Sequence, residues 1–221
     1  TVIKVPGGVD LYQLSMLKVN PATALLMLER YVALQPGDWV IQNAGNSAVG
    51  RYLIQLAVAK GLHTVNVVRR AELADELRDI GADLVLVDGD DLPERVRAEI
   101  GDANLPLGID AVAGLGTLRL GGCLSDGGTV VNYGLLSGEP CQLTADMVVF
   151  KSITLTGFWL AKLLGSMAPA EVGALYARLA QQVEAGTLHV PVEATYGLDQ
   201  LDKALEHAYR SGRSGKVLIT P

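Results

Sequence analysis

The chain has few of the residues from which metal sites and disulfide frameworks are built. Among its 221 residues are two cysteines and three histidines. Cys123 and Cys141 are too few and too far apart for a structural zinc site or a disulfide framework. His63, His189 and His207 are isolated from one another in sequence, as surface and structural histidines usually are. We therefore predict no bound metal, and the lack of disulfides and of a secretory signal favours a cytoplasmic location.

The chain also lacks long apolar runs and long basic runs. Although the mean hydropathy is +0.29, Gly, Pro or charge interrupts every apolar stretch before the ~20 residues that a membrane-spanning helix needs. We therefore attribute the hydrophobicity to a buried sheet and predict no membrane association. A net charge of −6 without an extended Lys/Arg run disfavours nucleic acid as a partner.

Short apolar runs alternate along the chain with longer segments of helical spacing. This alternation is typical of a parallel sheet whose two faces are covered by helices. The apolar runs predicted as strands are residues 39–41, 64–68, 84–87, 109–112, 129–133 and 153–157. The helices predicted between them are residues 48–61, 72–80, 92–100 and 116–124. We predict an α/β fold with a doubly wound, six-stranded parallel Rossmann sheet.

Past residue 160 the pattern changes. Helices are predicted at 169–185 and 199–209, each with an apolar stripe, and a strand is predicted at 216–219. Residues 143–157 combine a helix with a strand at the edge of the main sheet. Because an edge strand must be covered or paired, we predict a homodimer joined through this strand.

A stretch of small and polar residues, Gln-Asn-Ala-Gly-Asn-Ser-Ala-Val-Gly at 42–50, lies between the first predicted strand and the first long helix. A helix N-terminus at this place offers unpaired N–H groups to a phosphate, and small residues let the phosphate approach the backbone. Against the fingerprint G-x-G-x-x-G, the first glycine corresponds to Ala44 or Asn43 and the second to Asn46 or Gly45. A tight turn without a ligand is the alternative. The doubly wound context favours dinucleotide binding.

Two adjacent arginines, Arg69 and Arg70, follow the second predicted strand, and no carboxylate occurs until Glu72. NAD-binding domains normally place an acid here for the ribose 2′-hydroxyl. Its absence also disfavours a methyltransferase that uses S-adenosylmethionine. A guanidinium matches a 2′-phosphate in charge and in hydrogen-bonding geometry, so we predict NADPH as the cofactor. An exposed charge pair without a ligand is the alternative.

Several segments resemble a known family, the 2-enoyl thioester reductases. The most specific are Gln-Asn-Ala-x-Asn-Ser-x-Val-Gly at 42–50 and Gly-Phe-Trp-Leu at 157–160. Further matches, which extend the resemblance over nearly the whole chain, lie at residues 19–24, 34–38, 66–69, 127–129 and 133–134. These enzymes belong to the zinc-independent branch of the medium-chain dehydrogenase/reductase superfamily, near the quinone oxidoreductases.

The resemblance implies an NADPH-dependent oxidoreductase. In such enzymes NADPH delivers a hydride to the β-carbon of a 2-enoyl-CoA or acyl-carrier-protein thioester, and a tyrosine near the nicotinamide is the proposed proton donor. Reduction of a quinone or enone is the alternative within the superfamily. An alternative of another class is a cofactor-binding fragment that is inactive on its own. Because none of Tyr12, Tyr31, Tyr52 and Tyr133 falls in the family's donor motif, the catalytic residues stay unassigned.

The resemblance also implies which residues surround the cofactor. Asn20 would lie beside the nicotinamide, and Lys216 would reach the cofactor from the C-terminal strand. The residues implied for the pyrophosphate are Asn46, Ser47, Ala48 and Val49, and those for the 2′-phosphate are Arg69 and Arg70. The residues that would follow the cofactor after the fifth strand are Tyr133, Gly134, Leu135 and Leu136. Phe158, Trp159 and Leu160 would line the nicotinamide and acyl pocket, with burial in the core as the alternative for the two aromatics.

Two positions depart from the family's pattern. Ala71 stands where the family often has a basic residue, which would loosen binding of the 2′-phosphate. Ala48 stands where the family often has glycine. This second departure costs little if Ala48 has helical dihedral angles, because only a positive φ requires glycine.

The family has a GroES-like substrate domain of about a hundred residues, which would precede Thr1. We expect residues 1–20 to be the tail of that domain and residues 21–160 to form the NADP-binding Rossmann domain. Residues 161–221 would return toward the substrate domain. The proposed proton donor would then lie in the substrate domain.

Overall fold

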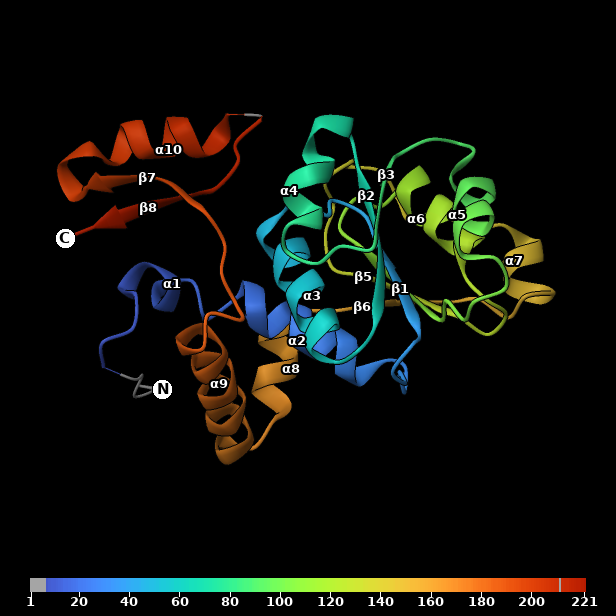
Figure 1. Cartoon of the computed structure of the whole chain (residues 1–221), viewed down its shortest axis with the longest axis horizontal. Helices are drawn as coiled ribbons and strands as arrows, with labels where there is room; N and C mark the ends of the chain where they lie inside the picture. The colour runs from blue at the N-terminus through green and yellow to red at the C-terminus, as the bar shows by residue number, and fades with distance from the viewer. Residues whose placement is uncertain (1–6, 211) are drawn as a thin grey trace.

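The computed structural model describes residues 7–210 and 212–221, so most of the predicted opening segment, residues 1–6, lies outside the described residues. The centre of the molecule is a six-stranded parallel sheet in the order β3-β2-β1-β4-β5-β6 (Figure 1). Its strands are β1 (Trp39–Gln42), β2 (His63–Val68), β3 (Leu84–Val87), β4 (Leu107–Asp110), β5 (Thr129–Asn132) and β6 (Thr154–Gly157). The predicted doubly wound α/β fold is confirmed.

Helices cover both faces of this sheet. The helices are α1 (Leu11–Ser15), α2 (Asn20–Arg30), α3 (Ala48–Ala59), α4 (Ala74–Arg78), α5 (Leu92–Ile100), α6 (Leu115–Cys123), α7 (Ala145–Val149), α8 (Leu160–Ser166), α9 (Pro169–Glu184) and α10 (Leu201–Tyr209). Two short 3₁₀ turns, Ala71–Leu73 and Leu198–Gln200, precede α4 and α10. In the described parts of the chain, no helix has the length and apolar character needed to cross a membrane.

Neighbouring residues of a strand enter different hydrophobic cores, because side chains alternate across a sheet. Val40 of β1 packs in the core formed with α2, α3 and α9. The next residue, Ile41, packs in the core formed with α5 and α6 on the opposite face. Both residues are fully buried. The near-continuous apolar strands seen in the sequence therefore supply two cores at once.

The fourth strand lies two residues earlier than predicted, at Leu107–Asp110 and not at 109–112. The carboxylate of Asp110 accepts hydrogen bonds from the backbone N–H groups of Val112 (2.9 Å) and Ala113 (3.0 Å). These bonds turn the chain away from the sheet directly after Asp110. The start of the strand is hard to predict from the sequence, because it includes Gly108 and glycine has a low strand propensity.

A second, small sheet lies apart from the first, with α10 beside it (Figure 1). It consists of the parallel pair β7 (Val192–Gly197) and β8 (Lys216–Thr220). The strand β8 matches the prediction, whereas β7 is not predicted. A parallel pair joined through a helix leaves no local turn signal in the sequence, which is why β7 is hard to recognise.

Candidate functional site

A pocket of about 600 Å³ opens at the carboxyl ends of the main sheet. Its lining includes residues that follow strands directly, namely Asn43 after β1, Arg69 after β2 and Asp88 after β3. Val112 and Leu136 come from the loops that follow β4 and β5. The sheet order places β1 between β2 and β4, so the chain leaves β1 at the point where the winding direction changes. Ligands of open α/β sheets bind at this switch point.

The loop between β1 and α3 forms the centre of the pocket. Ser47 caps α3, and its Oγ accepts a hydrogen bond from the backbone N–H of Gly50 (3.1 Å). Ala44 has φ +49°, the left-handed region that non-glycine residues rarely adopt. Ala48 is the first residue of α3 and does not have a positive φ. The absence of glycine at position 48 is therefore tolerated, as expected.

Gly50, in the first turn of α3, cannot carry a side chain, because a Cβ there would collide with the carbonyl oxygen of Gly45. This is the role of the third glycine in the dinucleotide fingerprint, which allows a close approach of helix and strand. Counted back from Gly50, the first two fingerprint positions are Gly45 and Ser47. Both alignments suggested by the sequence, which began at Ala44 or at Asn43, are wrong.

The pocket is strongly cationic although the whole chain carries a net charge of −6. The basic residues of its lining are Arg51, Arg69, Arg70, Arg210, Arg213 and Lys216. Among the described residues that line the pocket, Asp88 is the single acid. Asp88 is paired with Arg119 (2.8 Å). Across residues 7–210 and 212–221, no ion pair engages Arg69, Arg213 or Lys216. Such a pocket favours a ligand with several negative charges.

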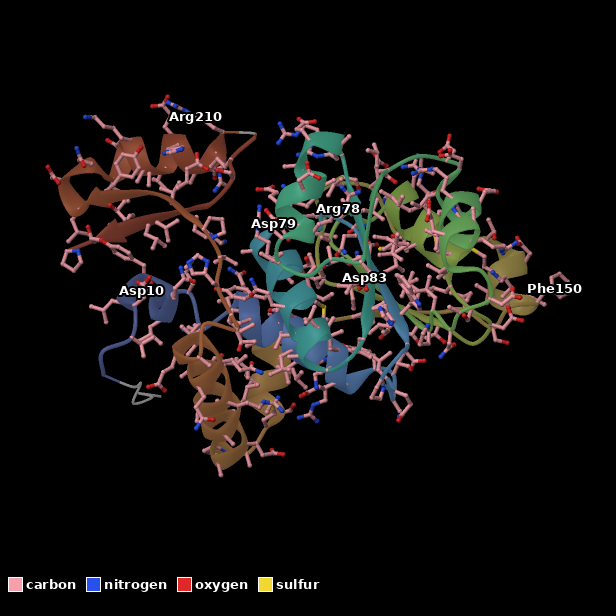
Figure 2. All side chains as sticks on the ribbon, in the orientation of Figure 1. Asp10, Arg78, Asp79, Asp83, Phe150 and Arg210 are labelled. Carbon is pink, nitrogen blue, oxygen red and sulfur yellow. The ribbon has the colours of Figure 1, made fainter. Side chains whose placement is uncertain are left out.

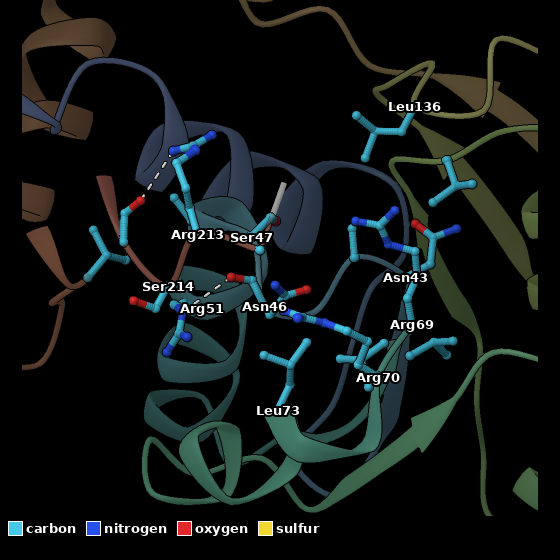
Figure 3. A pocket seen from close by; sticks show the side chains of 18 of the residues that line it. Asn43, Asn46, Ser47, Arg51, Arg69, Arg70, Leu73, Leu136, Arg213 and Ser214 are labelled. Atoms are coloured by element: carbon cyan, nitrogen blue, oxygen red, sulfur yellow. Dashed lines mark hydrogen bonds between the residues drawn. The ribbon is translucent and has the colours of Figure 1, made fainter. Parts of the chain in front are cut away.

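The basic residues approach from two sides (Figure 3). Arg69 and Arg70 extend from the end of β2, Arg213 and Ser214 come from the other side, and Asn46 and Ser47 lie between them. The pocket thus has a first wall, formed by the loops after the sheet strands. Its second wall is formed by residues 212–216 together with Val190 and Pro191.

Burial and the nearby charge of Arg213 both lower the pKa of Lys216 in the second wall. The backbone N–H of Lys216 donates to the carbonyl of Pro191 (2.8 Å), which fixes the start of β8. Behind the first wall, the half-buried Tyr133 has a pKa raised to about 12 by burial, while a hydrogen bond with Ser47 acts in the opposite direction. Tyr133 is therefore neutral at physiological pH.

A buried hydrogen-bond network lies under the first wall. Asp110 accepts hydrogen bonds from the amide of Asn43 (2.6 Å) and from the hydroxyl of Thr117 (2.5 Å). Asn43 in turn accepts from the backbone N–H of Ala111 (2.7 Å). With the backbone donors described above and the amide of Asn132 (3.2 Å), the carboxylate has five donors. Its role is to tie the ends of β1 and β4 together, since its acceptor capacity is in use.

The structure places seven of the predicted cofactor residues in the pocket. These are Asn46, Ser47, Ala48, Arg69, Arg70, Leu136 and Lys216. The predicted residues that lie outside this pocket are Asn20, Val49, Tyr133, Gly134, Leu135, Phe158, Trp159 and Leu160. Phe158 is 8% exposed and packs edge-on against Tyr31, with ring centroids 6.4 Å apart, whereas Trp159 is 70% exposed. Burial in the core therefore describes Phe158 and not Trp159.

The polar lining residues that the predicted set lacks include Arg51, Arg210, Arg213 and Ser214. Arg51 donates to the carbonyl of Asn46 (3.2 Å) and so stabilises the loop between β1 and α3, residues 43–47, which we call the phosphate loop. The other three belong to a stretch in which basic residues alternate with glycine and serine up to Lys216. This alternation of basic and small residues is the feature of the sequence from which a basic, anion-binding segment could have been predicted.

The described residues contain no group of three or more His, Cys, Asp or Glu side chains that could hold a metal ion. The pocket offers the N-terminus of α3 and several cations, which bind anions. Its chemistry fits a phosphorylated organic ligand.

Comparison with known proteins gives a family and a set of relatives. Residues 48–181 match the family described as zinc-binding dehydrogenase. The chain is 37% identical over 224 aligned residues to the mitochondrial enoyl-[acyl-carrier-protein] reductase of Rattus norvegicus, covering 99% of this chain and 60% of that protein. The chain thus spans about 60% of the length of this relative.

Solved structures of reductases are also similar to this chain. A protein from Bacillus thuringiensis described as a candidate NADPH:quinone reductase has a TM-score of 0.92 at 25% identity, covering all of this chain and 67% of that one. The mitochondrial 2-enoyl thioester reductase Etr1p/Etr2p heterodimer from Candida tropicalis has a TM-score of 0.85 at 27% identity, covering 98% and 63%. Etr1p is also known in complex with NADP and crotonyl-CoA.

These relatives correct one prediction. The enoyl-[acyl-carrier-protein] reductases of rat, human and Candida tropicalis are mitochondrial proteins, so the predicted cytoplasmic location is wrong. The prediction depended on reduced cysteines and on the lack of a visible targeting segment. A reducing environment is not confined to the cytoplasm, which is why cysteine content did not identify the compartment.

Proposed function

The chain belongs to the zinc-binding dehydrogenase family, within the medium-chain dehydrogenase/reductase superfamily, and on this premise we propose that it is the NADPH-binding part of a 2-enoyl thioester reductase. The observation that carries the proposal is the cationic pocket at the switch point of an acidic chain. NADPH has one phosphate more than NADH. The excess of basic groups fits that extra phosphate.

The pyrophosphate of NADPH lies against the N-terminus of α3, near Asn46, Ser47, Ala48 and Val49. The close packing of Gly50 on Gly45 lets the backbone of the loop approach the pyrophosphate. The 2′-phosphate lies between Arg69 and Arg70 of the first wall and the basic residues of the second wall. Arg70 already reaches across, since its Nη1 lies 3.8 Å from the place that a Cβ on Gly212 would occupy.

The nicotinamide end extends from the pocket past Leu135 and Leu136 toward Asn20, with Lys216 on the opposite side. Leu135, Leu136 and Trp159 are exposed apolar side chains, which support an apolar surface for the nicotinamide and acyl groups. Tyr133 and Gly134 support this segment from below. Gly134 packs so closely on Ala111 that a Cβ there would lie 2.5 Å from its carbonyl oxygen.

When bound, NADPH supplies the hydride that saturates the β-carbon of the enoyl thioester, and the α-carbon takes a proton. This chain's residues hold and orient the hydride donor. The proton donor stays unassigned among the described residues. The rat enoyl reductase and the Etr1p complex with crotonyl-CoA support this substrate class.

Reduction of a quinone is the second candidate. It is favoured by the TM-score of 0.92 to the Bacillus thuringiensis protein, against 0.85 for Etr1p. The sequence motifs at 42–50 and 157–160 favour the enoyl thioester. Rates of NADPH oxidation with crotonyl-CoA and with a benzoquinone distinguish the two candidates, and no turnover with either supports a cofactor-binding fragment.

Residues 21–160 act as the NADP-binding domain, and α9 packs in its core. Beyond α9, the rest of the segment 161–221 returns toward a substrate domain, of which residues 1–20 are the tail. The support is an unpartnered apolar surface on the small C-terminal sheet and α10. Its exposed apolar residues are Leu198, Leu201, Leu205, Tyr209 and Ile219. A two-stranded sheet is not stable by itself, so a covering domain is expected.

The active assembly is a homodimer joined through the β6 edge. Strand β6 has no neighbour on its outer side within the described sheet. Phe150, directly after α7 and four residues before β6, projects from the molecule and is 81% exposed (Figure 2). The Candida tropicalis Etr1p/Etr2p pair shows that a relative forms a dimer. We expect a dimeric mass by light scattering at micromolar concentration and a monomeric mass for Phe150→Asp. A monomeric parent protein contradicts the proposal.

Titration of NADPH and NADH tests the proposed cofactor. We expect NADPH to bind at least tenfold more tightly than NADH, because the 2′-phosphate adds charge-assisted hydrogen bonds. The double variant Arg69→Ala, Arg70→Ala should lose most of this preference and keep its affinity for NADH. Equal affinities for the two cofactors in the unaltered protein would contradict the proposal.

A further inference from the structure

A series of hydrogen bonds runs through the small C-terminal sheet and ends at the second wall of the pocket. Glu193 of β7 accepts at Oε2 from the backbone N–H groups of Ser214 (2.7 Å) and Gly215 (3.0 Å). Its Oε1 lies 2.8 Å from Nε2 of His207 in α10. Nδ1 of His207 lies 2.9 Å from the hydroxyl of Tyr196, also in β7.

The chemistry of these groups fixes the direction of the bonds. A carboxylate only accepts, so Nε2 of His207 carries the hydrogen that faces Glu193. In the neutral imidazole, Nδ1 then accepts from the hydroxyl of Tyr196. The hydrogen bond from His207, together with those from the two backbone N–H groups, lowers the pKa of Glu193. Glu193 is therefore ionised at neutral pH and a strong acceptor.

Residues 212–216 depend on this carboxylate for their position. Gly215 lies flat against β7, where a Cβ would be 2.7 Å from the carbonyl oxygen of Pro191 and 2.8 Å from the backbone N of Glu193. The guanidinium of Arg213 donates to the carbonyl of Gly215 (3.3 Å). The Arg213 side chain is thus oriented by the carbonyl of Gly215, a residue whose backbone N–H is held by Glu193. Glu193 itself stands behind the wall and not in the pocket lining.

We propose that Glu193 is a positioning residue: it holds residues 212–216 so that Arg213, Ser214 and Lys216 face the phosphate-bearing end of the cofactor, while His207 and Tyr196 orient its carboxylate. The proposal rests on the proposed binding of NADPH in this pocket. It assigns a function to a His–Glu–Tyr cluster that takes no part in hydride transfer. The sequence gives no sign of it, because the three side chains come from β7 and α10.

The test measures dissociation constants for NADPH, NADH and adenosine 2′,5′-bisphosphate by calorimetry. Glu193→Ala should weaken binding of NADPH and of the bisphosphate by about tenfold, since the backbone hydrogen bonds that hold Ser214 and Gly215 to a charged acceptor are lost. Affinity for NADH should change by less than about threefold, because NADH lacks the 2′-phosphate. Glu193→Gln should recover part of the loss, since its amide oxygen can still accept from Ser214 and Gly215. His207→Phe and then Tyr196→Phe should have smaller effects.

The matched control is Asp202→Ala, which removes an exposed carboxylate from α10 and should bind all three ligands as the parent does. An unchanged NADPH affinity in Glu193→Ala, or an equal loss for NADPH and NADH, overturns the positioning role. If Glu193→Ala fails to fold, Glu193→Gln and Tyr196→Phe are measured in its place. The positioning role is then overturned if neither variant weakens NADPH binding more than NADH binding. Failure of the parent protein to bind NADPH or the bisphosphate contradicts the proposed function itself. Normal binding by the parent without a selective loss in Glu193→Ala contradicts only the positioning role, so the two failures are distinguishable.

Discussion

The two walls of the pocket are supported in different ways. The first wall stands on the six-stranded sheet and is tied by the buried contacts of Asp110 with Asn43 and Thr117. The second wall is held by the small β7–β8 sheet and, at residues 212–216, by the half-exposed carboxylate of Glu193. A change in the first wall therefore disturbs the core. A change in the second wall should alter ligand affinity while the fold persists.

The largest expected effect is on the first wall. Asp110→Ala removes an acceptor of five hydrogen bonds and leaves the buried amide of Asn43 without its partner. We expect a loss of about 3–5 kcal/mol in the free energy of unfolding, as for a broken buried polar network. Urea denaturation measures it, with the exposed Asp102→Ala as control. A loss below about 1 kcal/mol would show that the network does not support the wall.

The next effect concerns the contact between the phosphate loop and α3. Gly50→Ala places a Cβ against the carbonyl of Gly45, so we expect a destabilisation of about 1–3 kcal/mol, typical of overpacking. NADPH affinity should fall as well, because the loop must move. Gly173→Ala, in α9 at a position where a Cβ would have no neighbour within 4 Å, should be neutral or stabilising. Equal effects of the two substitutions would contradict a specific contact at Gly50.

A smaller effect, of opposite sign, is expected at Ala44. Its φ of +49° is strained for alanine, and glycine relieves this strain. The greater freedom of glycine in the unfolded chain offsets part of the gain, so Ala44→Gly should stabilise the protein by up to about 1 kcal/mol. Thermal unfolding monitored by circular dichroism measures the change. A clear loss of stability would mean that the alanine methyl group makes a contact that outweighs the strain.

The smallest effect on stability is expected in the second wall. Arg213→Ala should change the free energy of unfolding by less than about 0.5 kcal/mol, as for most surface substitutions. The same variant should lose about tenfold in NADPH affinity, from one charge-assisted contact. Parallel denaturation and calorimetry give both values for one preparation. A large loss of stability with unchanged affinity would reverse the distinction between the two walls.

The same contrast explains what could be predicted from the sequence. The first wall is local: the residues of 42–50 and the pair Arg69-Arg70 each follow a recognisable apolar run, so their positions at one end of the sheet could be inferred. The second wall is not local. Arg213 and Ser214 reach the pocket because β8 pairs in parallel with β7, a long-range contact without a turn signal.

Finer features depended on geometry that residue types do not encode. The fingerprint could be aligned in several ways until the close contact of Gly50 with Gly45 fixed its register. Phe158 and Trp159 are neighbours of similar character, yet one is buried against Tyr31 and the other is exposed, because adjacent side chains leave the strand end in different directions. The fold could be predicted from the periodicity of apolar residues, whereas the full set of residues that line the pocket could not.

The parallel pairing of β7 with β8 also has a consequence for biosynthesis. The ribosome releases the phosphate loop and Arg69-Arg70 long before it releases Arg213 and Lys216. A nascent chain can therefore fold its large sheet while the pocket still lacks one side. The basic residues of the second wall join the pocket only when β8 pairs with β7. We therefore expect the full affinity for a phosphate-bearing dinucleotide to be reached only after the small sheet has formed.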